Sequence, residues 1–159
     1  MLNKYKKNMK NKKIKINTDK LFVNITKEVR EFCELHKKKS GFINIFSQHT
    51  TCCVKILEDE ILHKTDVRFF LDKIAPKWKE PEGDHKNIKY LHDLISLRED
   101  CPKNEPINGH SHIRSLFFNS SETIPMINGR LSLGKWQSIF VVELDPNRDR
   151  EIILTFLEG

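Results

Sequence analysis

The chain has 159 residues, of which 38% are hydrophobic and 31% are charged, and this size and composition are typical of one folded domain. It contains no apolar run near the ~20 residues that cross a bilayer, and its basic N-terminus precedes no long apolar segment of the secretory kind. These features argue against a membrane-spanning or secreted protein and favour a soluble cytoplasmic one.

The basic excess lies almost entirely at the N-terminus. Residues 1–15 carry seven lysines and no acid, so the remaining residues sum to −1 although the whole chain carries +6. We expect residues 1–12 to form a flexible basic tail and residues 13–159 to form a single domain. A basic tail can bind nucleic acid through its charge alone. A general Lys/Asn bias explains this tail equally well, so a nucleic-acid partner is not expected.

The first half of the domain predicts strands and helices in mixed order. Val29, Phe32 and Cys33 recur at the spacing of a helix face, and Gly41 stands where a helix commonly stops. The stretch GFINIFSQHTTCCVKILED is rich in β-branched and aromatic residues, which favours strands with a bend at SQHTT. In chain order we expect a strand over 12–18, a helix over 26–38, two strands or one bent strand over 41–59, a helix that ends before Pro76, and a long irregular segment over 76–108.

The last third of the chain predicts antiparallel strands after a short helix near His112. Asn128-Gly129 is typical of a two-residue hairpin turn, and PNRD indicates a second turn. The strands are expected over 121–127, 130–134, 135–145 and 150–158, arranged as an antiparallel meander. Antiparallel strands with segregated helices indicate an α+β fold, and the absence of an internal repeat indicates one domain.

The four cysteines show no metal-binding or disulfide pattern. Cys33, Cys52, Cys53 and Cys101 form no Cys-x-x-Cys pair and no regular framework. Cys52 and Cys53 are adjacent, so on a strand they point to opposite faces and do not easily hold one ion together. We expect reduced thiols that fill the core.

Four histidines stand at informative positions: His49 in SQHTT, His92 in the irregular segment, and His110 and His112 in NGHSHIRS. Imidazole is a common ligand of zinc, and a usable site needs three converging side chains. His110 and His112 share one side of an extended segment but diverge by about 200° on a helix. The spacing leaves open both a metal site and structural histidines with satisfied hydrogen bonds.

Basic residues near turns could bind an anionic ligand. Arg114 follows His112 by two residues, Arg130 follows the Asn-Gly turn, and Lys135 follows Gly134. Glycine lets the backbone approach a ligand closely, and Arg can donate two parallel hydrogen bonds to a phosphate or carboxylate. Ordinary surface charge beside a hairpin is the alternative explanation.

Other polar residues could support such a site. Thr50 and Thr51 could donate hydroxyl hydrogen bonds to a ligand, and Asp93 and Glu105 could orient histidines. The chain has no Gly-rich phosphate loop, no Rossmann fingerprint and no Walker sequence, which argues against the large nucleotide-using classes.

The chain resembles the YjbQ-like family in four stretches. They are HTT at 49–51, NGHSHIRSLF at 108–117, IPMINGRLSLGKWQSIFVVELD at 124–145 and the closing REIILTFLEG. The resemblance covers about residues 12–159, and its G-R-L-x-L-G-x-W-Q run is specific. Some members of that family are described as secondary thiamine-phosphate synthases.

The resemblance implies an α+β fold with an antiparallel β-sandwich-like core and a few helices, assembled as a homotrimer. It also implies a pocket built from the motif histidines. His49 matches the family histidine before a Thr-Thr pair, His112 matches the one ahead of a hydrophobic and a basic residue, and His92 matches a third, less uniformly placed histidine. His110 sits where many relatives carry another residue.

The residues and the resemblance together predict a metal-dependent enzyme for a small phosphorylated or anionic substrate, with weak thiamine-phosphate synthase-like activity. The sequence lacks the multiple carboxylates of a magnesium–pyrophosphate site, so the thiamine reaction is expected to be a side activity. The alternative is a non-catalytic metal-binding or scaffold trimer. The expected site residues fall into three sets: catalytic His49, His112 and Arg114; substrate-binding Thr50, Thr51, Arg130 and Lys135; and His49, His92 and His112 as ligands of a divalent zinc or magnesium ion.

Overall fold

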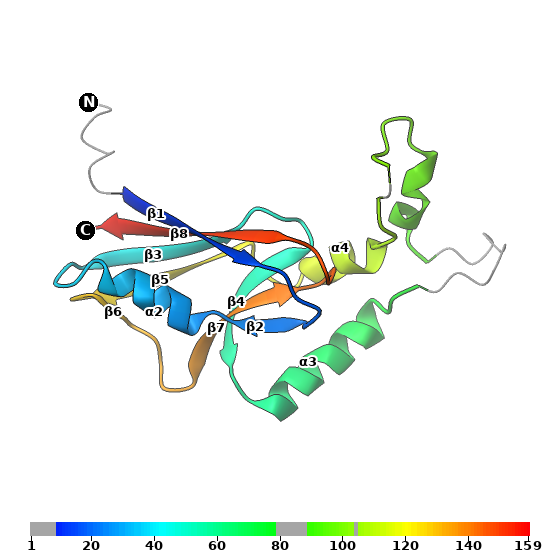
Figure 1. Ribbon diagram of the computed structural model, residues 1–159. Helices are drawn as coiled ribbons and strands as arrows, with labels where there is room; N and C mark the ends of the chain where they lie inside the picture. The colour runs from blue at the N-terminus through cyan, green and yellow to red at the C-terminus, as the bar shows by residue number, and fades with distance from the viewer. Residues whose placement is uncertain (1–8, 79–88, 104) are drawn as a thin grey trace.

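The computed structural model describes residues 9–78, 89–103 and 105–159, which form two antiparallel sheets with helices around them (Figure 1). The larger sheet has, in spatial order, β1 (Met9–Ile16), β8 (Arg150–Glu158), β3 (Gly41–Ser47), β5 (Ser121–Ile127) and β6 (Arg130–Leu131). The smaller sheet has β2 (Phe22–Asn24), β7 (Gln137–Glu143) and β4 (Cys52–Glu58). The helices are α2 (Thr26–Glu34), α3 (Ile61–Ile74), the 3₁₀ helix η2 (Leu91–Leu97) and α4 (Gly109–Ser115). This arrangement confirms the predicted single-domain α+β fold.

The main core lies between the two sheets. Alternate residues of each strand point inward, as the two-residue period of a strand requires. From the larger sheet Ile43 and Leu154 are fully buried, and from the smaller sheet Val54 and Val141 are fully buried against them. Helix α2 adds its apolar face to the same core, including Val29. This packing matches the β-sandwich-like core that the family resemblance implies.

The outer face of the smaller sheet is covered by α3. Leu71 of α3 packs with Val142 of β7 and Cys53 of β4 in a second, smaller core. Cys52 belongs instead to the main core, so the two adjacent cysteines do point to opposite faces. Burial raises the pKa of Cys52 to about 11 and that of Cys53 to about 12, which keeps both thiols protonated at neutral pH. The expectation of core-filling cysteines is confirmed for this pair.

The strand positions are close to those predicted, but the predicted meander is wrong. Strands β7 and β8 belong to different sheets, and β8 lies between β1 and β3. Strand β7 is the centre of the smaller sheet and is buried on both faces, because the larger sheet covers one face and α3 covers the other. Strand β6 is limited to Arg130–Leu131, shorter than the expected 130–134.

The helices also differ from expectation at their ends. Helix α2 stops at Glu34 rather than near residue 38, and Lys38 adopts a left-handed φ of 66° in the turn that follows. Helix α3 begins at Ile61, because the Glu60 side chain accepts hydrogen bonds from the first free N–H groups of the helix. None of the helices in the described residues is long and apolar enough to span a membrane.

The boundary of the basic tail lies earlier than predicted. Residues 9–12, which the sequence assigned to the tail, form the first half of β1, and Met9 pairs with Leu157. Lysines on β1 suit an edge strand because their charge discourages pairing with another chain. Residues 1–8 of the predicted tail and residues 79–88 of the predicted irregular segment lie outside the described residues.

Candidate functional site

Helix α4 begins at Gly109, so His110 and His112 are both helical and their rings face different surroundings. His110 is only 7% exposed and lines a hollow with Trp78 and Asp145. His112 instead faces His92. The rings of His110 and His112 therefore diverge, as expected for residues two apart on a helix.

His92 and His112 form the closest pair of imidazoles in the candidate site. Their ring centroids are 4.3 Å apart and their planes are inclined by 34°. His92 comes from η2 and His112 from α4, the next element along the chain. The Nδ1 atom of His92 is buried and has no hydrogen-bond partner among the described residues. The fold thus brings together two of the three predicted metal ligands.

A contact between η2 and α4 holds the histidine pair in place. Asp93, next to His92, is buried and accepts a hydrogen bond of 2.7 Å from the backbone N–H of Gly109. A Cβ atom on Gly109 would lie 2.6 Å from Cβ of Tyr90, so only glycine fits at this point. We expected Asp93 to orient a histidine directly; it instead fixes the start of the helix that carries His112.

The surroundings of His112 favour a neutral imidazole. Burial lowers its pKa, and the neighbouring His92 lowers it further, whereas the carboxylates of Asp145 and Glu105 act in the opposite direction. A neutral imidazole is the form that binds a metal ion, and the lowered pKa of His112 favours this form at neutral pH.

His49 occupies a separate hollow at the bend between β3 and β4. Its Nε2 atom accepts a 3.0 Å hydrogen bond from the backbone N–H of Glu151, which leaves Nδ1 to carry the proton of the neutral ring. Burial, followed by the charge of Arg150, lowers its pKa. The hollow measures about 670 Å³ and is also lined by Ser115 and Leu116, so it borders the C-terminal end of α4.

The predicted three-histidine set is not assembled within one chain. Among the residues that the structure describes, no three His, Cys, Asp or Glu side chains are grouped as metal ligands. The physical reason lies in His49, whose Nε2 is engaged by the backbone of β8, whereas His92 and His112 pair on η2 and α4. Two ligands are therefore close together and the third is held elsewhere.

The side chains of Arg114 and Thr51 are buried and hydrogen-bonded to other residues of the fold. Arg114 is 8% exposed; its Nε donates to the carbonyl of Ala75 at 2.9 Å and its Nη2 donates to Asp72 at 2.6 Å. It therefore ties α4 to the end of α3. The Thr51 hydroxyl is buried and accepts a hydrogen bond from Arg150. Thr50, in contrast, is exposed and lines the His49 hollow, where a ligand could reach it.

Arg130 and Lys135 do not join the histidines. Arg130 lies on β6, at the end of the molecule opposite α4 (Figure 1), and lines a different hollow. Lys135 lies in the β6–β7 loop with its Nζ 4.6 Å from the ring centre of Trp136. The substrate-binding residues predicted from sequence are thus divided between two regions.

A buried ion pair that lies beside His49 was not predicted from the sequence. Glu143 and Arg150 are 2% and 4% exposed, and the guanidinium of Arg150 donates to both carboxylate oxygens. Arg150 also donates to the Asp145 carbonyl, so it fixes the turn that leads into β8. The available signal was a glutamate inside the apolar run IFVVEL, because a charge in a buried strand requires a partner.

Comparison with known proteins decides the family. A family model described as "UPF0047 protein YjbQ-like" matches residues 10–159. The chain belongs to this YjbQ-like family. It is 32% identical over 130 residues to a UPF0047 protein of Methanothermobacter thermautotrophicus, covering 82% of this chain and 78% of the relative. It is 31% identical to the YugU protein of Bacillus subtilis, covering 80% of this chain and 83% of the relative.

Solved structures of other proteins share the fold. A protein of unknown function from Sulfolobus solfataricus superposes with a TM-score of 0.77 at 25% identity, covering 95% of this chain and 98% of the other. A hypothetical protein from Aeropyrum pernix gives a TM-score of 0.75 at 26% identity, covering 94% and 99%. The family and fold predicted from the motifs are therefore confirmed.

Proposed function

We propose that this YjbQ-like protein is a metal-dependent enzyme that acts on a small phosphorylated or otherwise anionic substrate. The observation that carries the proposal is the His92–His112 pair, with ring centroids 4.3 Å apart and a buried ring nitrogen of His92 that has no partner among the described residues. A buried polar atom without a partner is costly in a purely structural pair, and a bound ion would satisfy it.

The donor set favours zinc over magnesium. Imidazole nitrogen suits zinc, whereas magnesium prefers oxygen ligands. A catalytic zinc site commonly has three protein ligands and an open position, so two histidines leave the site incomplete. Within the described residues, no Asp or Glu side chain joins the two histidines in a three-ligand group. The remaining ligand is therefore expected from another copy of the chain.

The chain's own residues would assist such a reaction from the neighbouring hollow. A divalent ion supplies Lewis-acid stabilisation of charge on a phosphate oxygen. His49, with Nε2 fixed by Glu151, presents a protonated Nδ1 that can donate a hydrogen bond to a leaving group. The hydroxyl groups of Thr50 and Ser115 line the same hollow and can orient a polar substrate.

Thiamine-phosphate synthesis is proposed only as a weak side activity. That reaction joins a pyrimidine pyrophosphate to a thiazole phosphate with loss of pyrophosphate, and the leaving group requires strong charge stabilisation. Arg114 is already bonded to Ala75 and Asp72, so it is poorly placed to act as the charge clamp that the sequence suggested.

We also propose that the protein assembles as a homotrimer. Phe70 of α3 and Phe117, which follows α4, are 49% and 52% exposed and pack edge to face at 5.7 Å. Leu116, 77% exposed, lines the His49 hollow next to them. Exposed aromatic and aliphatic groups of this kind are typical of a surface covered by another chain. A second copy seated there would border the site and could supply its missing ligand.

Zinc titration tests the proposed metal site. Isothermal titration of Zn²⁺ into the metal-free full-length protein should give one site per chain, with affinity reduced at least about 100-fold in His92→Ala and in His112→Ala. His63→Ala, on α3 away from the pair, is the matched control and should bind normally. Unchanged affinity in both His92→Ala and His112→Ala would overturn the assignment.

Turnover separates the enzyme from the scaffold alternative. The zinc-loaded protein should hydrolyse or transfer at least one substrate from a panel of phosphate monoesters and diphosphates, and His49→Ala should slow turnover about 10²-fold or more while retaining zinc. Zinc binding with no turnover, accompanied by a large loss of thermal stability in His112→Ala, would support the non-catalytic metal-binding trimer instead.

A further inference from the structure

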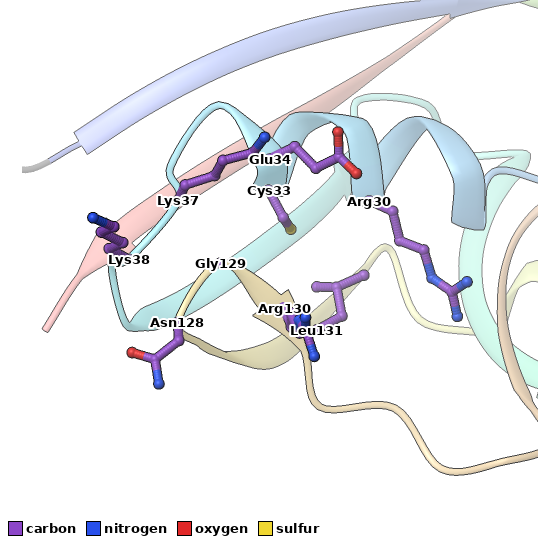
Figure 2. Close-up of a pocket in the computed structure, with 9 residues that line it drawn as sticks. All are labelled: Arg30, Cys33, Glu34, Lys37, Lys38, Asn128, Gly129, Arg130 and Leu131. Carbon is purple, nitrogen blue, oxygen red and sulfur yellow. The ribbon is translucent and has the colours of Figure 1, made fainter.

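A further hollow lies between α2 and the β5–β6 hairpin (Figure 2), elements that stand at the end of the molecule opposite η2 and α4 (Figure 1). It measures about 590 Å³, within the range of small-molecule sites. Its polar walls carry four cationic side chains, from Arg30, Lys37, Lys38 and Arg130. In the view of Figure 2, Arg30 stands at one end of the hollow, the two lysines stand at the other, and Arg130 lies between them.

The charge of this hollow is unusual for the chain. Four cations and one acid, Glu34, line it, whereas residues 16–159 as a whole sum to −1. Within the described residues, none of the four cations belongs to an ion pair. Other lysines nearby are paired: Lys39 lies 2.7 Å from Glu158, and Lys27 lies 4.0 Å from Glu31. Among the described residues the four cations are therefore not engaged in ion pairs, and Glu34 is the one acid that lines the hollow with them.

The helix dipole accounts for only part of this cluster. Lysines after the C-terminus of a helix commonly offset its partial negative charge, and Lys37 and Lys38 follow α2 in this way. Arg30 lies in the middle of the helix and Arg130 lies on a different element, β6. Neither arginine is explained by the dipole, so the presence of both on one hollow requires another reason.

The walls of the hollow are held together by backbone contacts. The N–H of Gly129 donates to the carbonyl of Lys39 at 2.8 Å, and the N–H of Asn128 donates to the hydroxyl of Ser40 at 3.1 Å. A Cβ on Gly129 would lie 3.1 Å from Cα of Lys37, and Gly129 has a φ of 76° that favours glycine. The two turns are thus fixed side by side, so the backbone that carries the cationic side chains is held in place.

We propose that this hollow binds a small organic phosphate that carries two or more negative charges, at a site separate from the His92–His112 pair. Arginine recognises phosphate by paired, charge-assisted hydrogen bonds, and two arginines with two lysines can neutralise a multiply charged group. Leu131 and the buried Cys33 give the hollow an apolar wall for the organic part of the ligand. A hollow of this size suits a small molecule better than an extended polymer.

Titration with inorganic pyrophosphate tests the proposal. The full-length protein is titrated at low ionic strength in the presence of EDTA, so that any metal-dependent site is silent. We expect binding that weakens at least about tenfold in Arg130→Gln and further in Arg30→Gln/Arg130→Gln. Arg68→Gln, an exposed arginine on α3, is the matched control and should bind as the wild type does. Thermal melting of each variant confirms that the exposed substitutions leave the fold intact.

Three outcomes would overturn the proposal: no binding of pyrophosphate, equal binding by the Arg30/Arg130 double variant, or binding of a single-stranded oligoribonucleotide that pyrophosphate does not displace. The last result would indicate a polyanion-binding surface. His112→Ala separates this site from the proposed function, because it should weaken zinc binding at least about 100-fold and leave pyrophosphate binding in EDTA unchanged. Loss of pyrophosphate binding in His112→Ala would also contradict a separate site.

Discussion

At the scale of single residues, the least replaceable contacts involve buried charge. Glu143 lies in the apolar strand β7, and Arg150, at the start of β8, bonds both of its carboxylate oxygens. The same guanidinium reaches Thr51, so one side chain joins β8, the β3–β4 bend and β7. Removing one partner leaves the other charge buried and unpaired, which costs far more than losing an exposed pair.

We therefore predict that Arg150→Met lowers the free energy of unfolding by about 3–5 kcal/mol. Urea denaturation followed by circular dichroism measures the effect. Lys13→Met, which breaks the exposed Lys13–Glu151 pair on β1, is the control and should cost below about 1 kcal/mol. A similar small loss in both variants would show that the buried pair is not needed for stability.

His36 gives the fold a pH-dependent component. Its ring stacks on Phe156 at 4.6 Å and meets Phe32 edge to face. Burial, then the positive charges of Lys39 and Lys10, lower its pKa, while the carboxylate of Glu158 acts in the opposite direction. The unfolded chain, with an ordinary histidine pKa of about 6.5, therefore takes up this proton more readily than the folded chain. Its contribution to stability is complete above about pH 6.5 and is lost as the pH falls toward the lower folded pKa.

We predict that His36→Phe makes the protein less sensitive to acid. Phenylalanine keeps an aromatic ring in the stack and cannot take up a proton. The difference between urea midpoints at about pH 8 and about pH 5 should be smaller in the variant than in the wild type. An identical pH dependence in both proteins would contradict this assignment.

At the scale of elements, the site depends on the packing of η2 against the start of α4. Gly109 allows the close approach of Tyr90, and the Asp93 carboxylate accepts a hydrogen bond from the buried N–H of Gly109. This contact positions His92 relative to His112, since each lies within a few residues of it on its own element.

We predict that Gly109→Ala destabilises the protein by about 1–3 kcal/mol, because the added Cβ would overlap Tyr90 and Asp93. It should also weaken zinc binding by separating the two histidines. Gly134→Ala is the control: its Cβ would meet the flexible end of Gln137 at 3.3 Å, and the change should be nearly neutral. Chemical denaturation and zinc titration measure both effects, and a neutral Gly109→Ala would contradict the packing argument.

At the scale of the whole molecule, the two ends of the fold have different character. The end formed by η2, α4 and α3 (Figure 1) carries His92, His112 and exposed aromatic groups, and the end formed by α2 and the β5–β6 hairpin carries the cationic hollow. The first end suits contact with further copies of the chain, and the second suits a charged small molecule. This separation lets assembly and anion binding be tested independently.

We predict that the protein is a trimer in solution and that Phe70→Ser/Phe117→Ser shifts it to the monomer. The substitutions remove the two packed rings from the exposed surface of α3 and the segment after α4. Leu35→Ser, which removes a 72% exposed side chain at the end of α2, is the control and should remain trimeric. Size-exclusion chromatography with light scattering measures the mass. A monomeric wild type, or a trimeric double variant, would contradict the proposed surface.

The sequence by itself determined the fold class, the positions of most strands, the hairpin turn at Asn128-Gly129 and the family. These features follow from local periodicity, turn chemistry and continuous motifs, which are properties of short stretches of chain. The same local information placed His92 and His112 among the candidate residues.

Only the tertiary structure decided which of the candidates meet. His49 accepts a hydrogen bond from the Glu151 N–H, and Arg114 is tied to α3. Arg130 lines the cationic hollow together with Arg30. None of these contacts produces a periodic pattern in the sequence. The strand order that places β8 between β1 and β3 is likewise set by core residues distant in the chain. Long-range pairing depends on all the surfaces that must be buried at once, so it is decided by the whole fold and not by any one segment.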